Sequence, residues 1–206
     1  MIDQAVLRLF RCRPLRTAFD GILRDELIPE LRCRPGVIDV QVGRKGPDEL
    51  GERLVASVWG SHEAMVASVG EDLESSPFHP EYLAETADRS LELLPLATVL
   101  RFGGTREPGI VRLARGMVQP GELPEYVEEA RVGALGDSAG GAGPIALYLA
   151  IDEPDRFVTL SIWDTWASIE AATGADVRRP IATQRSERLV AFDVNHYEAV
   201  HGLVRA

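Results

Sequence analysis

The chain has 206 residues, of which 45% are hydrophobic, enough for one large globular domain or for two of ordinary size. Its formal net charge is −10, and both halves of the sequence share the acidic excess. Because binding to phosphate backbones needs a basic footprint, we expect no nucleic-acid partner.

The N-terminus lacks a basic segment followed by an apolar one, and no apolar run reaches the ~20 residues of a membrane span. These features predict a cytoplasmic protein with no membrane partner. Cys12 and Cys33 form neither a CxxC pair nor a disulfide framework, so we expect two reduced thiols.

The sequence repeats itself at an offset of 104 residues. Residues 6–11 (Val-Leu-Arg-Leu-Phe-Arg) match residues 110–115 (Ile-Val-Arg-Leu-Ala-Arg), and Ser57-Val58-Trp59 matches Ser161-Ile162-Trp163. A repeat of this length indicates a duplicated domain. We therefore predict one unit over residues 1–104 and a second over residues 105–206, joined by a linker rich in glycine.

Alternation and helical spacing predict the elements of the first unit in chain order. Thr17 is the expected N-cap of its first helix, and Pro29 is expected to kink that helix or end its regular part. The expected elements are a strand at 5–12, a helix at 17–32, strands at 37–43 and 53–59, a helix opened by Ser61, a helix at 81–94 and a strand at 97–102.

The same series restarts after the linker. The elements expected in the second unit are a strand at 110–118, a helix at 122–135, a glycine-rich loop at 136–143, strands at 144–151 and 156–163, a helix at 165–173 capped by Gly174, a short helix at 181–189 and a strand at 191–199.

Each unit thus reads β-α-β-β-α-β, the ferredoxin-like order, which gives an antiparallel sheet with helices on one face. The other face is half apolar and needs a partner, which the second copy supplies. We predict an α/β (α+β) fold in which two ferredoxin-like units pack their sheets into a pseudo-dimeric α/β barrel with an internal cavity.

The unit order, the Ser-[Val/Ile]-Trp that ends the third strand and the helix after it resemble the antibiotic biosynthesis monooxygenase superfamily, the dimeric α/β barrels. The resemblance covers nearly the whole chain. The resemblance implies the barrel fold. The superfamily includes cofactor-independent oxygenases of polyphenols and quinols as well as haem-degrading enzymes.

Strand alternation predicts which side chains face the cavity. Leu7, Leu9, Leu54, Ala56 and Val58 are expected beneath the helices. Phe10, Ser57, Ala114, Thr159 and Ser161 are expected inside with the candidate substrate-binding residues, which are Arg8, Asp39, Gln41, Trp59, Arg112, Tyr148, Trp163, Asn195 and Tyr197.

Two roles remain open for the most distinctive of these residues. Arg8 and Arg112 could bind an anionic or phenolate oxygen, or they could form buried structural pairs, for instance Arg8 with Asp39. Trp59 and Trp163 could stack on a planar substrate, or they could fill the core.

The histidines show no metal-ligand spacing, so we expect no metal and no cofactor. They are His62, expected on an exposed helix turn, His79 in a loop, His196 on the last strand and His201 in the tail. Haem-degrading relatives use an Asn on strand one, a Trp ending strand three and a His on the next helix. Trp59 and Trp163 match the tryptophan. The asparagine position falls near Arg8 or Arg112, and the histidine position falls near Val69 or Thr173.

The resemblance therefore implies a cofactor-independent monooxygenase acting on a polycyclic phenol or quinol, with catalytic residues unassigned. The alternative is a non-catalytic ligand-binding or structural barrel, and haem binding ranks below both. The expected partner is a small aromatic or hydrophobic ligand, and the self-paired chain could form a further homodimer.

Overall fold

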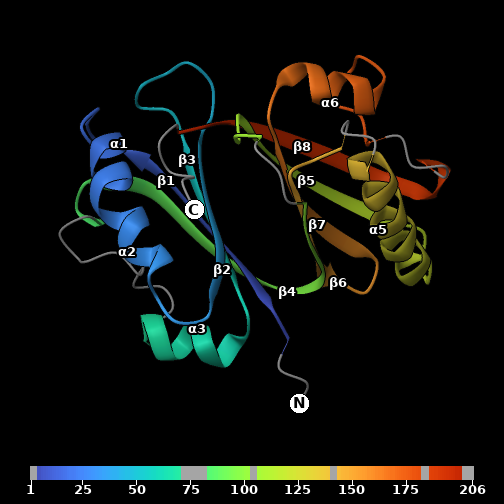
Figure 1. Ribbon diagram of the computed structural model, residues 1–206, viewed down its shortest axis with the longest axis horizontal. Coiled ribbons are helices and arrows are strands. Elements are labelled where there is room, and N and C mark those ends of the chain that lie inside the picture. Colours follow the sequence, from blue (N-terminus) through green and yellow to red (C-terminus); the bar gives the residue numbers. More distant parts are fainter. Residues whose placement is uncertain (1–3, 71–82, 103–105, 140–142, 182–185, 201–206) are drawn as a thin grey trace. The chain divides into compact units, whose positions relative to one another are not determined.

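The computed structural model describes residues 4–70, 83–102, 106–139, 143–181 and 186–200 (Figure 1). The chain forms two compact units, one made of residues 1–95 and 197–206 and the other of residues 96–196. Two long strands, β4 (Thr86–Arg101) and β8 (Leu189–Ala199), contribute residues to both units. Each unit is described by itself below.

The first unit is an antiparallel sheet of β1 (Val6–Pro14), β2 (Val37–Arg44) and β3 (Arg53–Trp59), with β1 and β2 on either side of β3. The start of β4 pairs with β1, and the end of β8 pairs with β2. Its helical segments are α1 (Phe19–Ile22), the π-helical η1 (Leu23–Leu27), α2 (Ile28–Arg32) and α3 (His62–Val69).

The first helical segment of this unit runs without a break from Phe19 to Arg32, but its middle turn is π-helical. Pro29 has no N–H to donate, and the wider turn just before it accommodates the missing bond. The helix begins at Phe19 with Ala18 at the N-cap and no side-chain bond there, so the predicted Thr17 cap is wrong.

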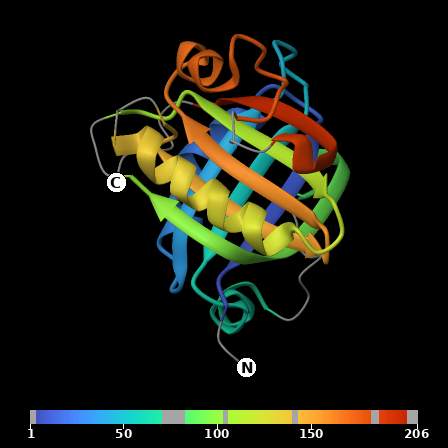
Figure 2. The ribbon, with the colours of Figure 1, turned by 90° about the vertical axis from the view of Figure 1, so that its right-hand side faces the viewer.

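The second unit contains β5 (Ile110–Val118), β6 (Ala146–Glu153) and β7 (Arg156–Trp163), with β7 paired to both β5 and β6. The remaining elements are α5 (Leu123–Ala139), α6 (Trp166–Thr173) and the 3₁₀ turn η2 (Ser186–Arg188). The end of β4 pairs with β6, and β8 lies next to β5. Figure 2 shows α5 lying across one face of this sheet.

The repeat is visible at the helix ends. The Ser61 hydroxyl accepts a bond from the Ala64 N–H at the start of α3, and the Thr165 hydroxyl does the same for Ser168 at the start of α6. Gly174 ends α6 with φ of 74°, a left-handed conformation that favours glycine. The Ser61 start and the Gly174 cap confirm the sequence predictions.

Three predicted elements differ in the structure. The helix expected at 81–94 is wrong, because the chain from Thr86 onward is β4 and pairs with β1. Leucines at helical spacing also suit a strand half-buried on both faces, and Pro95 disfavours a helix interior. The loop expected to start at residue 136 is helical up to Ala139. Of the short helix expected at 181–189, the described part is only the η2 turn before β8.

The predicted faces of two strands are reversed in the first unit. Val6, Phe10 and Trp59 pack with the residues of α1 and α2 in one hydrophobic cluster, so these alternate positions of β1 and β3 lie beneath the helices. Leu7 and Leu9 lie on the opposite face. Every residue of β3 and nearly every residue of β1 is buried, so hydrophobicity did not distinguish the two faces.

The α+β class and the eight antiparallel strands are confirmed. The packing of the two units into one barrel stays a prediction. Within the described ranges, no helix combines the length and apolar character needed to cross a membrane.

Candidate functional site

Both units carry the same three side chains beneath their helices. In the first, Arg8 lies opposite Ser57 in the β1–β3 pairing, and the Trp59 Nε1–H donates to the Ser57 hydroxyl at 2.9 Å. In the second, Arg112 lies opposite Ser161, and Trp163 donates to Ser161 at 2.9 Å. All six side chains are buried. The duplication has therefore kept an Arg-Ser-Trp set on the helix-covered face.

The units differ at the positions around this set. Where β1 carries Phe10 and Cys12, β5 carries Ala114 and Gly116 at the repeat offset. The second unit accordingly holds a cavity of about 390 Å³, within the range of small-molecule sites. Its lining residues are Arg112, Ala114, Tyr126, Glu128, Glu129, Ala130, Val132, Gly133, Ala134, Pro144, Leu147, Phe157, Thr159, Pro180, Ile181 and Phe192.

Aromatic rings form part of the cavity wall. Tyr126 on α5 stacks on Phe157 of β7, with ring centroids 4.4 Å apart. Gly116 makes this possible, because a Cβ at that position would lie 2.2 Å from the Phe157 ring. The ring thus occupies the space that a side chain at position 116 would fill.

Arg112 places a positive charge on the sheet side of the cavity. Its side chain is buried, one Nη donates to the Arg179 carbonyl at 2.6 Å, and its guanidinium carbon lies 5.7 Å from the centre of the Phe192 ring. Its buried Nε has no hydrogen-bond partner in the described part of the chain. Burial lowers the pKa of Arg112 to about 10, so the group stays charged at neutral pH and favours an anionic oxygen nearby.

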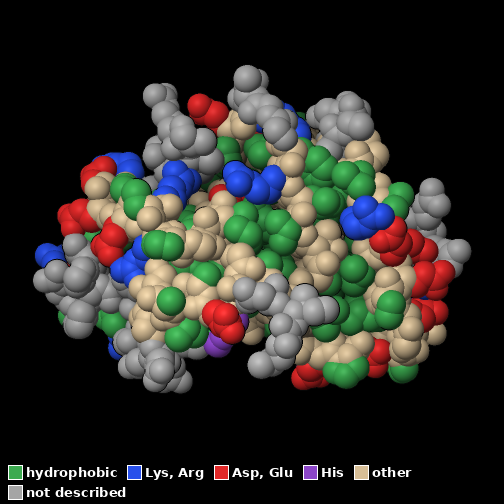
Figure 3. All heavy atoms as spheres, turned by 60° about the horizontal axis from the view of Figure 1, so that its bottom comes forward, with side chains coloured by type: hydrophobic (Ala, Val, Ile, Leu, Met, Phe, Trp, Pro, Cys, Tyr) green, Lys and Arg blue, Asp and Glu red, His purple; other side chains and the backbone are tan. Residues whose placement is uncertain are grey.

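The helix side of the cavity is acidic. Glu128 and Glu129 line it, and Figure 3 shows acidic side chains gathered on the right, where Figure 1 places α5. Glu129 also faces the buried Arg188 at 3.6 Å. Burial raises the pKa of Tyr126, so its hydroxyl keeps its proton. An acidic rim around a basic interior favours a ligand that arrives neutral and ionises inside.

His196 lies near the same arginine. Its ring contacts Trp166 of α6 at 5.1 Å between centroids, and its buried Nε2 has no hydrogen-bond partner among the described residues. Burial, with the charges of Arg112 and Arg178, lowers the pKa of His196 to about 4. The imidazole is therefore neutral at neutral pH.

Of the predicted site residues, Arg112 alone lines this cavity. Trp163 is buried beside Ile110 and Ile169. Tyr148 pairs with Leu160, which places it on the face of the sheet away from α5, as predicted. Asn195 donates to Asp193 at 3.4 Å, which puts the two on one face of β8 and opposite the cavity-lining Phe192.

The other predicted residues lie in the first unit. Gln41 donates to both carboxylate oxygens of Asp39 at 3.1 Å. None of the three Arg8 nitrogens has a hydrogen-bond partner among the described residues, so the alternative pairing of Arg8 with Asp39 is wrong. The Tyr197 hydroxyl donates to Glu52 at 2.7 Å. Arg8 and Trp59 lie beneath the helices and not on the opposite face where they were expected.

Sequence reasoning missed Tyr126, Glu129, Phe157 and Phe192. The cavity was predicted on the sheet face away from the helices, so no residue of α5 was expected to line it. A signal was present in the repeat, because the exchange of Phe10 for Ala114 and of Cys12 for Gly116 removes volume from one unit only.

The described ranges contain no cluster of three or more His, Cys, Asp or Glu side chains placed to hold a metal ion. His62 is exposed, as predicted, whereas His79 and His201 lie outside the described residues. At the helix positions where haem-degrading relatives carry histidine, Val69 is half-buried and the buried Thr173 hydroxyl donates to the Ile169 carbonyl.

No protein family model and no curated protein matches this sequence. Several solved structures are nevertheless similar to it in fold. A candidate monooxygenase from Lactobacillus acidophilus aligns over 96% of this chain and 95% of its own, with a TM-score of 0.72 and 10% identity. An anthrone oxidase-like protein covers 97% and 93%, with a TM-score of 0.57 and 18% identity.

A third similar structure is an uncharacterized ferredoxin-fold protein from Listeria monocytogenes, related to antibiotic biosynthesis monooxygenases. It covers 94% of this chain and 95% of its own, with a TM-score of 0.51 and 13% identity. These likenesses confirm the predicted ferredoxin-like α+β fold over nearly the whole chain.

Proposed function

We propose that the second unit is a cofactor-independent monooxygenase that oxidises a polycyclic phenol, quinol or anthrone in its cavity. The observation that carries the proposal is the buried Arg112 guanidinium, which lines an aromatic-walled cavity of about 390 Å³ and whose Nε has no hydrogen-bond partner among the described residues. The monooxygenase and anthrone oxidase-like neighbours share the fold and make this chemistry the first to test.

The reaction needs the substrate as an anion, because an electron-rich carbanion or phenolate can reduce oxygen without a cofactor. Arg112 stabilises the negative oxygen of that anion in a site where little water screens the charge. The protonated Tyr126 hydroxyl donates a second hydrogen bond to the same oxygen. The rings of Tyr126, Phe157 and Phe192 pack on the planar substrate.

Glu129 is the proposed acceptor of the substrate's proton. For anthrone, a methylene proton moves to the Glu129 carboxylate, and the resulting anion transfers electrons to oxygen and forms a carbon–oxygen bond. The peroxide takes the proton back and loses water, which leaves the quinone carbonyl. One oxygen molecule is consumed and one water is released for each anthrone, so atoms and electrons balance.

The test is oxygen uptake by the full chain with anthrone, with anthraquinone measured by its absorbance. We expect Arg112→Met to raise KM and lower kcat/KM by about 100-fold, because it removes a charge-assisted contact to the anion. Glu129→Gln should lower kcat with little change in KM. Matched circular dichroism spectra control for folding.

The non-catalytic alternative gives a different result in the same experiment. If anthrone or 2-naphthol binds the wild-type protein and Arg112→Met weakens binding, but oxygen uptake does not exceed the uncatalysed rate, the cavity is a binding site without turnover. If neither compound binds, both the oxidation and the aromatic-ligand proposal are wrong.

A further inference from the structure

Arg8, in the first unit, is buried with no hydrogen-bond partner among the described residues. Its side chain is 0% exposed, and neither its Nε nor either Nη has a hydrogen-bond partner in the described part of the chain. The charge that most affects it is another cation, Arg34. A buried charge without a counter-ion is strongly destabilising, so native proteins rarely leave one without a ligand or ion pair.

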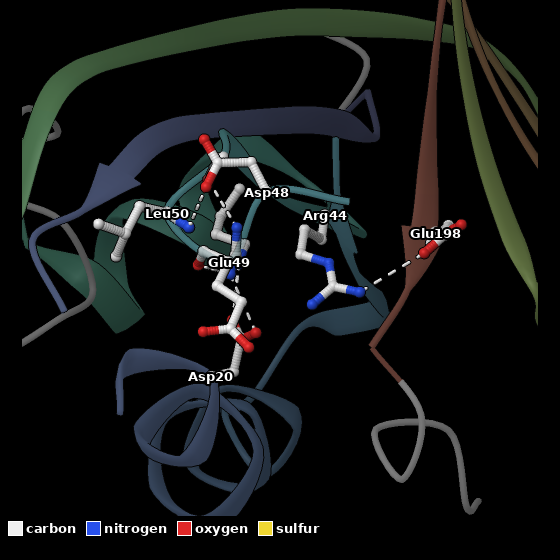
Figure 4. Close-up of polar contacts among 8 residues, drawn as sticks. Asp20, Arg44, Asp48, Glu49, Leu50 and Glu198 are labelled. Atoms are coloured by element: carbon white, nitrogen blue, oxygen red, sulfur yellow. Dashed lines mark hydrogen bonds and ion pairs between the residues drawn. The ribbon is translucent and has the colours of Figure 1, made fainter. Parts of the chain in front are cut away.

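Another buried arginine in the same unit shows what complete pairing looks like. Arg53 is 1% exposed, and its Nε and one Nη donate to the Asp20 carboxylate at 2.6 and 3.0 Å. It also donates to the carbonyls of Glu49 and Gly51. Figure 4 labels Asp20 and Glu49, two of the residues that accept these bonds. Among the residues that the structure describes, Arg8 has no comparable contact, although the same unit pairs another buried guanidinium fully.

The side chains around Arg8 suit an oxyanion. Ser57 lies opposite Arg8 on the neighbouring strand, and its oxygen already accepts the Trp59 N–H. The Ser57 hydroxyl proton is thereby directed elsewhere and is available to donate. Arg34, whose side chain bonds the Ser68 carbonyl and Glu30, adds positive potential to the same region.

The size of the ligand follows from Phe10. This ring belongs to the hydrophobic cluster beneath α1 and α2, two positions along β1 from Arg8, where the second unit has Ala114 and an open cavity. Because the Phe10 ring takes the place that is open in the second unit, we expect the site to take a two-carbon acid rather than an aromatic one. The planar guanidinium fork matches a carboxylate in geometry.

We propose that the first unit contains a second binding site, centred on the Arg8 guanidinium and the Ser57 hydroxyl, that takes the carboxylate of a small organic acid. The site is distinct from the cavity of the second unit and does not depend on the oxidation proposed there. Under the two proposals, Arg112 binds an aromatic anion and Arg8 binds a small carboxylate.

The experiment is isothermal titration calorimetry of the full chain with sodium acetate, with sodium chloride at equal ionic strength as the blank. All titrations use Arg112→Met protein, so that the arginine of the second unit cannot contribute. We expect one acetate site, weakened about 100-fold when Arg8→Met is added. Ser57→Ala should weaken it about 10-fold, as one hydrogen bond is lost.

Two further measurements keep the test decisive. Without acetate, Arg8→Met should unfold at higher urea concentration than its parent, because an unpaired buried charge is gone. If Arg8→Met does not fold, Arg8→Lys replaces it, and we expect about a 10-fold loss from the missing fork.

Benzoate tests the size limit and should not bind the Arg112→Met protein. Failure of acetate to bind that protein, equal acetate binding after Arg8→Met, or benzoate binding as tightly as acetate would each overturn the proposal. None of these outcomes bears on oxygen uptake with anthrone, so the two proposals fail separately.

Discussion

The residue two positions after the buried arginine is Phe10 in the first unit and Ala114 in the second. Phe10 is 3% exposed and packs with the helix residues above it, whereas Ala114 lines a cavity. The Arg, Ser and Trp side chains around these positions are the same in both units. The exchange of Phe10 for Ala114 is therefore one of the changes in side-chain volume that accompany the cavity of the second unit.

A second difference lies in how the two arginines are partnered. Arg112 donates one Nη to the Arg179 carbonyl and has a ring nearby, whereas Arg8 has no partner in the described ranges. Burial lowers the pKa of both to about 10, so both remain charged at neutral pH. The repeat retains the buried charge while its surroundings differ, and under the two proposals each unit binds a different anion.

The largest expected effect comes from making the first unit like the second. Phe10→Ala should lower the free energy of unfolding by about 3–5 kcal/mol, because it leaves a cavity in a packed core. Urea denaturation followed by circular dichroism measures it. Leu15→Ala, at a side chain that is 58% exposed, is the control and should change stability by less than about 0.5 kcal/mol. If Phe10→Ala lowered the free energy of unfolding no more than the control does, Phe10 would not fill the interface.

The reverse exchange should close the cavity of the second unit. Ala114→Phe places a ring next to Arg112, and we expect binding of 2-naphthol to weaken at least about 30-fold while the protein stays folded. Fluorescence titration measures the affinity. Ala114→Gly, which adds no volume, is the matched control and should bind as the wild type does. Unchanged affinity after Ala114→Phe would place the ligand elsewhere.

Two glycines of α5 allow a test from the helix side. A Cβ at Gly133 or Gly136 meets nothing within 4 Å, but only Gly133 lines the cavity. Replacing either with leucine should stabilise the helix by up to about 1 kcal/mol. Gly133→Leu should also weaken 2-naphthol binding about 10-fold, and Gly136→Leu should not. Equal effects of the two on affinity would contradict the assigned wall.

The smallest effect concerns pH. The pKa of His196 in the folded protein, about 4, lies below its ordinary value of 6.5. The unfolded chain therefore binds a proton first, and stability is lost as pH falls from about 6.5 to about 4. His196→Gln should reduce the slope of unfolding free energy against pH in that window, because it removes the imidazole whose burial, with the charges of Arg112 and Arg178, opposes protonation. An identical slope in both proteins would show that His196 does not titrate in this way.

The sequence by itself indicated the internal repeat, most of the strands and the helix boundaries at Ser61 and Gly174, because these depend on local pattern and capping. It also singled out Arg8, Arg112, Trp59 and Trp163, since an internal repeat marks them without any structure. The likeness to antibiotic biosynthesis monooxygenases followed from the Ser-[Val/Ile]-Trp pattern and extends to the fold.

Only the tertiary structure decided which face of each sheet the helices cover. Strands β1 and β3 are buried on both sides, so apolar alternation carries no information about the face that a helix packs on. Pairing with β1 likewise made residues 86–94 a strand although their leucines suit a helix. The cavity depends on α5, Phe157 and Ala114 meeting in space, and residues so far apart in the chain come together only through packing.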